Sequence, residues 1–92
     1  MSRSAHLSIR GRVQGVGYRD WTARKARELG LSGWVRNRLD GSVEAVISGT
    51  DTLVAAMIAE CHSGPPPARV DAIDVSAWTD PIEPGFEVRK TG

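Results

Sequence analysis

The spacing of apolar residues changes along this chain from every second residue to every third or fourth, and the order of these changes strongly limits its possible folds. Leu7, Ile9 and Val13 alternate with polar residues, which is typical of a strand with one buried face. From Tyr18 to Leu29 the apolar residues recur at helical spacing. The same patterns predict five strands, at 7–13, 31–36, 43–47, 70–77 and 86–89, and two helices, at 18–29 and 51–61.

The predicted order is strand, helix, two strands, helix, strand and a short last strand. Right-handed connections then place both helices on one face of an antiparallel sheet. We therefore expect an α+β fold, a ferredoxin-like βαββαβ sandwich with two helices on one face and a short extra C-terminal strand at an edge. A chain of 92 residues is expected to form a single domain, residues 1–92.

Several local signals refine these elements. Thr50 or Asp51 is suited to cap the second helix, and Gly64 followed by three prolines ends it. Cys61 falls on the apolar stripe of that helix, so we expect a core residue and not a nucleophile. The alternation slips between 70 and 73, which indicates a bulge or a late start of the fourth strand.

Charge and cysteine content bear on location and ligands. One cysteine cannot form an internal disulfide, and no apolar run approaches the roughly 18 residues of a membrane span. We therefore expect a cytoplasmic protein with no membrane partner. The net charge is +1, but residues 1–46 hold nine Lys and Arg against four Asp and Glu, while residues 47–92 hold three against seven. This asymmetry indicates either an anionic ligand near the first half or the chance variation common in small domains.

The stretch 11–19, Gly-Arg-Val-Gln-Gly-Val-Gly-Tyr-Arg, connects the first strand directly to the first helix. Gly15 and Gly17 let backbone N–H groups converge, and a helix N-terminus adds unpaired donors, so the loop outlines an anion cradle. Arg19 in the first helical turn can bind two oxygens of a phosphoryl group. A glycine-rich turn can also serve only to reverse the chain. The spacing fits neither the Walker nor the dinucleotide-binding pattern, which disfavours ATP and NAD.

The sequence lacks the residues that other phosphatase mechanisms require. A thiol-based site needs an arginine close to the cysteine in the same loop, but Pro67 stands six residues after Cys61. We interpret His6 and His62 as ordinary surface residues, and Asp71 and Asp74 as solvated carboxylates. We therefore expect no metal and no cofactor.

A site of this kind suits a substrate whose leaving group is already good. The carboxylate of a carboxyl phosphate departs with little protonation, so catalysis reduces to positioning, charge stabilisation and orientation of one water. Asn37, at the end of the second strand, offers a donor and an acceptor for that water. An asparagine beside a turn can equally be structural.

Two segments resemble the signatures of the acylphosphatase family. The first is Gly-x-Val-Gln-Gly-Val-x-Tyr-Arg at 11–19, and the second is Gly-Trp-Val-Arg-Asn-x-x-x-Gly-x-Val at 33–43, followed by Gly49. Gly-Pro-Pro-x-Ala-x-Val at 64–70 and Phe-x-Val-Arg at 86–89 are similar to the family as well. The resemblance covers nearly the whole chain and implies a ferredoxin-like fold with metal-independent hydrolysis of the carboxyl–phosphate bond of acyl phosphates.

The resemblance also implies roles for individual residues. Arg19 would bind the substrate phosphate, Asn37 would position the water, and both would be catalytic. Backbone donors for the phosphate would come from Gln14, Gly15, Val16, Gly17 and Tyr18. The side chain of Gln14 is expected only to buttress the loop. Trp21, Trp34 and Trp78 are interpreted as packing or rim residues.

These expectations describe a monomeric enzyme that takes a small-molecule acyl phosphate and releases inorganic phosphate. The alternative is a non-catalytic module that binds phosphate or carbamoyl phosphate. RNA binding is disfavoured, because the outward positions considered on the first and third strands carry no aromatic rings and match no ribonucleoprotein motif. Those positions are Ser8, Arg10, Ser42, Glu44 and Val46.

Overall fold

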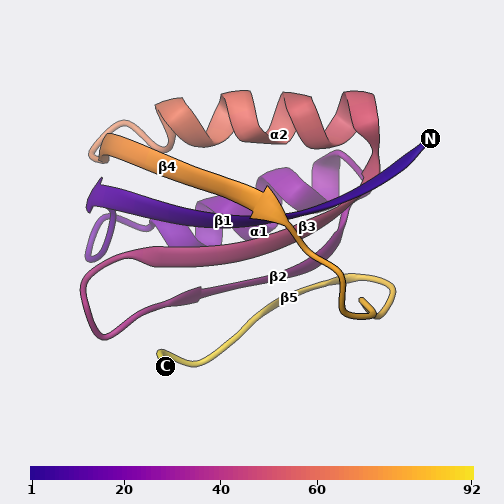
Figure 1. Ribbon diagram of the computed structural model, residues 1–92. Helices are drawn as coiled ribbons and strands as arrows, with labels where there is room; N and C mark the ends of the chain where they lie inside the picture. Colours follow the sequence, from indigo (N-terminus) through magenta and orange to yellow (C-terminus); the bar gives the residue numbers. More distant parts are fainter.

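The computed structural model describes all 92 residues, and its strands and helices follow the predicted order (Figure 1). The elements are β1 (Ser2–Arg12), α1 (Tyr18–Glu28), β2 (Ser32–Asn37), β3 (Val43–Thr50), α2 (Asp51–Ser63), β4 (Arg69–Ala77) and β5 (Phe86–Val88). They form one five-stranded sheet in the order β4-β1-β3-β2-β5. The ferredoxin-like βαββαβ arrangement with a short fifth strand at an edge is confirmed.

The sheet is mixed, whereas a wholly antiparallel sheet was expected. The pairs β1–β3, β1–β4 and β2–β3 are antiparallel, but β5 pairs with β2 in parallel. The chain leaves β4 at one end of the sheet and crosses to the opposite edge through residues 78–85 at that same end. β5 therefore runs in the opposite direction to β4 and in the same direction as β2.

The core lies between the sheet and the two helices, which cover the same face (Figure 1). Alternate strand residues point toward the helices, so that Leu7, Ile9 and Ile47 are fully buried against helical residues such as Val54 and Met57. β1 begins five residues earlier than predicted. Its first residues pair with the end of β3 but are mostly exposed, so they carry no apolar alternation.

The local signals have the expected consequences. Thr50 caps α2 by accepting a hydrogen bond from the backbone N–H of Leu53. A register shift between Arg10 and Gly11 on β1, opposite the start of β4, confirms the bulge. Cys61 is fully buried, and burial raises the pKa of its thiol to about 12. Its thiol therefore stays protonated at neutral pH, which confirms a packing role.

The helix-free face of the sheet carries aromatic rings, so the expectation that it lacks them is wrong. Trp78 stacks on His6 with ring centroids 5.7 Å apart, and it meets Trp34 edge-on at 6.0 Å. Trp34 lies on β2 and Trp78 in the loop after β4, whereas the expectation rested on residues of the first and third strands. The guanidinium groups of Arg36 and Arg89 lie over the ring of Trp34, which is 7% exposed. A nucleotide base therefore has no open indole face at Trp34 on which to stack.

His6 is not an ordinary surface residue, because it belongs to an ionic network on this face. Its Nε2 lies 2.7 Å from Oε2 of Glu44, whose other oxygen accepts hydrogen bonds from Arg36 at 2.6 Å and Arg38 at 2.9 Å. Burial raises the pKa of Glu44, but the hydrogen bonds from His6, Arg36 and Arg38 outweigh it and lower that pKa to about 2. The carboxylate is therefore held ionised by three partners.

We expect this network to make the protein less stable in acid. Because folding lowers the pKa of Glu44, its contribution is fully present above about pH 4.5 and is lost as the pH falls toward about 2. The free energy of unfolding should drop by about 1–2 kcal/mol over this range for this one group, since the network is partly exposed. Urea unfolding of the wild type and of Glu44→Gln at several pH values measures it. Equal pH dependence in both proteins would contradict the assignment.

Candidate active site

The predicted cradle and Asn37 meet at one end of the sheet. The connection from β1 to α1 and the hairpin between β2 and β3 lie at the same end in Figure 1, although they are far apart in sequence. They enclose a pocket of about 210 Å³, several times the roughly 30 Å³ that one water molecule takes up in the liquid. The pocket is lined by Val13, Gln14, Gly15, Gly17, Tyr18, Arg19, Asp20 and Asn37.

The backbone of the cradle is shaped by two glycines with positive φ. Gly15 has φ 74° and Gly17 has φ 79°, in the left-handed region where a side chain is strained. Gly17 is also the N-cap of α1, and no side chain caps this helix. The first amide groups of α1 therefore have no intrahelical acceptor and no capping side chain, and the helix dipole adds positive potential. This combination favours a bound anion.

Arg19 lies in the first turn of α1 and lines the same pocket. Its Nε is buried and has no hydrogen-bond partner within the protein. One terminal nitrogen donates to the backbone carbonyl of Arg89 at 3.4 Å, which is a long contact. Arg19 makes no ion pair with a carboxylate, so its charge is not neutralised by the protein.

Asn37 is the last residue of β2 and lines the same pocket. Its backbone is fixed by pairing with Val43 and by the backbone N–H of Gly92, which donates to the Asn37 carbonyl at 3.0 Å. Its side-chain Oδ1 is buried and, like Nε of Arg19, has no partner within the protein. Buried polar atoms are normally satisfied, so two unpartnered ones on residues that line a single pocket point to a polar ligand.

The side chain of Gln14 does more than fill space behind the loop. Its Nε2 donates to the backbone carbonyls of Arg38 and Ser42, each at 2.8 Å. These carbonyls flank the turn of the β2–β3 hairpin. The cradle is thereby attached to the hairpin that carries Asn37. The side chain of Gln14 supports the loop, as expected, and it does so by binding this hairpin.

The pocket differs from the predicted site in three residues. Val16, which was expected to offer only its backbone N–H, is not among the lining residues, and its side chain packs, half-buried, against the core. Val13 and Asp20 line it without having been predicted. Val13 is a buried residue that directly follows β1, and the exposed carboxylate of Asp20 lies in the first turn of α1. Val13 belongs to the 11–19 signature but had no assigned role, and the only sequence signal for Asp20 was its position directly after that signature.

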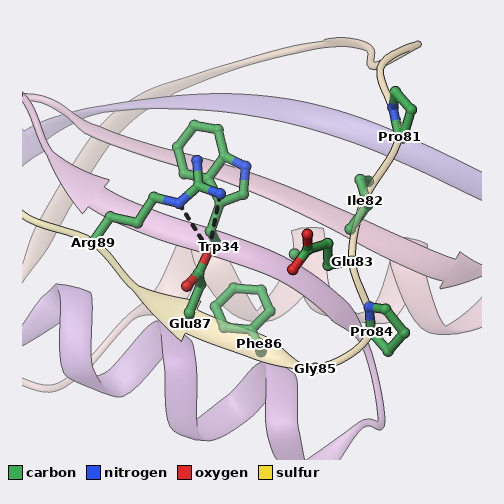
Figure 2. Close-up of a pocket in the computed structure, with 10 residues that line it drawn as sticks. Trp34, Pro81, Ile82, Glu83, Pro84, Gly85, Phe86, Glu87 and Arg89 are labelled. Carbon is green, nitrogen blue, oxygen red and sulfur yellow. Dashed lines mark hydrogen bonds and ion pairs between the residues drawn. The ribbon is translucent and has the colours of Figure 1, made fainter.

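A larger pocket, about 590 Å³, lies at the opposite end of β2 (Figure 2). Trp34, Phe86 and the 81–85 loop form its walls, and Arg89 also lines it, where it hydrogen bonds Glu87 and lies over the indole of Trp34. None of the predicted site residues lines this pocket. In the whole chain, no three His, Cys, Asp or Glu side chains gather in a way that would hold a metal ion. Neither helix has the length and apolar character of a membrane span.

Several known proteins similar in sequence to this chain belong to one family. A family model described as Acylphosphatase matches residues 5–88. The acylphosphatase of Rhodospirillum rubrum is 54% identical over 80 residues, covering 87% of this chain and 88% of its own. The acylphosphatase of Azorhizobium caulinodans is 53% identical over 92 residues, covering 99% of each chain.

The fold is similar to that of a solved acylphosphatase. The structure from Coxiella burnetii superposes with a TM-score of 0.91 at 33% sequence identity, over 96% of this chain and 93% of the other. The matched family model spans the cradle, Arg19 and Asn37 together. The chain belongs to the acylphosphatase family.

Proposed function

We propose that this protein hydrolyses the carboxyl–phosphate bond of acyl phosphates, with Arg19 and Asn37 as catalytic residues. The observation that carries the proposal is one pocket whose lining residues supply an uncapped helix N-terminus, an unneutralised guanidinium and an unpartnered buried amide oxygen. The first two attract a phosphoryl group, and the third can accept a hydrogen bond from a water molecule. The names of the relatives support the same reaction.

In the proposed mechanism the cradle holds the phosphoryl oxygens through the backbone N–H groups of residues 14–18, and Arg19 compensates their charge. Asn37 accepts a hydrogen bond from one water and directs its oxygen at phosphorus. A bond forms between that oxygen and phosphorus while the bond from phosphorus to the carboxyl oxygen breaks. The bond electrons leave with the carboxylate, and the proton of the water passes to the phosphate product or to solvent. Positioning and electrostatic stabilisation supply the rate enhancement.

This mechanism assigns no role to a metal, a cofactor or a protein base. The leaving carboxylate is a weak base, so it departs without a protein acid. A non-catalytic module that binds phosphate or carbamoyl phosphate would need the cradle but not Asn37. The unpartnered Oδ1 of Asn37 therefore favours the enzyme.

A direct assay tests the proposed reaction. Purified protein incubated with acetyl phosphate or benzoyl phosphate in excess chelator should release stoichiometric carboxylate and inorganic phosphate over many turnovers. The measurement is substrate consumption together with phosphate release, with and without chelator. Binding of either substrate without turnover would favour the binding module instead. Loss of turnover in chelator would overturn the metal-independent mechanism.

We also propose that residues 1–92 act as one domain and as a cytoplasmic monomer. The family match over 5–88 and the coverage of similar acylphosphatases along nearly their full length support a single domain. The one cysteine, which is buried and unpaired, fits a reducing compartment.

A further inference from the structure

The side chain of Gln14 is the one direct hydrogen-bonded link between the cradle and the hairpin that carries Asn37. Gln14 lies at the start of the cradle, and its single amide nitrogen has two N–H donors. One reaches the carbonyl of Arg38 and the other the carbonyl of Ser42, each at 2.8 Å. Both donors of this group are therefore directed into the hairpin and none toward the pocket.

The hairpin turn that receives these bonds is itself held together. The backbone N–H of Arg38 donates to the carbonyl of Ser42 at 2.8 Å, and Oδ1 of Asp40 accepts from the backbone N–H and the hydroxyl of Ser42 at 2.9 and 2.6 Å. The turn is therefore braced by its own hydrogen bonds, and Asn37 immediately precedes it. A group that holds this turn against the cradle therefore also helps to set the position of the Asn37 amide.

We infer that Gln14 is a positioning residue, whose side chain sets the distance between the bound phosphoryl group and the water held by Asn37. In-line attack depends on this distance, and a displacement of about 1 Å can cost about a hundredfold in rate. Gln14 thus acts through Asn37, while its backbone N–H contributes to the cradle. The inference rests on the proposed function, because it assigns Gln14 a part in the same reaction.

If Gln14 is a positioning residue, removing its side chain should lower kcat more than it weakens the binding of inorganic phosphate. Gln14→Ala should lower kcat for benzoyl phosphate by about tenfold or more. Inhibition by inorganic phosphate, which reports on the cradle alone, should weaken by less than about threefold, since the backbone donors and Arg19 remain. Ser4→Ala is the matched control, because it removes a side-chain bond to Ser48 at the other end of β1. Its kcat should match that of the wild type.

A double-mutant cycle separates positioning from simple support of the fold. If Gln14 acts through Asn37, adding Gln14→Ala to Asn37→Ala should lower kcat by less than about twofold. The same fold decrease in both backgrounds would overturn the inference, as would a Gln14→Ala enzyme with wild-type kcat. If Asn37→Ala alone kept full activity, the proposed catalytic role of Asn37 would fail instead, so the two failures are distinguishable.

Gln14→Glu gives a second, independent readout because it keeps the shape of the side chain and removes both donors. The ionised carboxylate would face two carbonyl oxygens, whereas the protonated acid regains one donor. The kcat of Gln14→Glu relative to the wild type should therefore rise as the pH falls. A ratio that does not change with pH would contradict the inference. Failure of both Gln14 variants to fold would also overturn it, since the bonds would then serve stability alone.

Discussion

Arg19→Ala is expected to reduce the hydrolysis of acetyl phosphate at least about a hundredfold in kcat/KM while the far-UV circular dichroism spectrum stays native. Arg19 lines the pocket, and its buried Nε is engaged by no protein group. Charge-assisted bonds to a transferring phosphoryl group strengthen in the transition state, and loss of one such group typically costs about 10²–10³ in rate. Removal of this side chain leaves the core intact, because Arg19 is only partly buried.

Two further variants show whether the effect belongs to this guanidinium. Arg24 lies on the same helix, is exposed and makes no ion pair. The activity of Arg24→Ala should therefore equal that of the wild type. Arg19→Lys keeps a positive charge but loses the planar pair of donors, so its activity should lie between those of the wild type and Arg19→Ala. Inhibition by inorganic phosphate should weaken in Arg19→Ala. A folded Arg19→Ala protein with full activity would exclude Arg19 from the site.

Asn37→Ala is expected to reduce kcat by about a hundredfold or more, with a different kinetic signature. The unpartnered Oδ1 of Asn37 is assigned to the water and not to the phosphate, so inhibition by inorganic phosphate should change little. The backbone hydrogen bonds of position 37 do not depend on the side chain, and the strand should remain intact. Steady-state kinetics with acetyl phosphate and phosphate as inhibitor measure both quantities.

The comparison of the two variants decides between an enzyme and a binding module. Ser32→Ala, at the other end of β2, is the control for loss of a polar side chain from this strand and should leave kcat unchanged. Weaker phosphate binding in Arg19→Ala and slower turnover in Asn37→Ala would support separate roles in one reaction. If Asn37→Ala turned over substrate at the wild-type rate, the water would have to be positioned by another group.

Much of the fold could be predicted because its signals are local. The alternation around Leu7 and Ile9 and the helical spacing after Tyr18 reflect the burial of one face of each element. The direction of β5 could not be predicted in this way, because a three-residue strand has the same alternation in either direction. The aromatic contacts of His6, Trp34 and Trp78 were missed for a related reason, since they join positions that are far apart in sequence.

The candidate site, like the fold, has some features that the local sequence indicates and others that only the structure shows. Glycines at 15 and 17 followed by an arginine already indicate an anion cradle, because positive φ and a helix N-terminus are consequences of neighbouring residues. Nothing local indicates that Gln14 reaches the carbonyls of Arg38 and Ser42. The sequence also does not show that Val16 turns toward the core while Asp20 joins the pocket.

By itself the sequence determined the order of the elements, the backbone character of the cradle and the residue types available for chemistry, since these depend on interactions between near neighbours. Only the tertiary structure decided that Arg19 and Asn37 share one pocket and that Gln14 ties their two segments together. The physical reason is the pairing of β2 with β3 and of β3 with β1, which brings the β2–β3 hairpin beside the end of β1. Long-range pairing of this kind is set by the packing of the whole sheet against its helices, and no single segment encodes it.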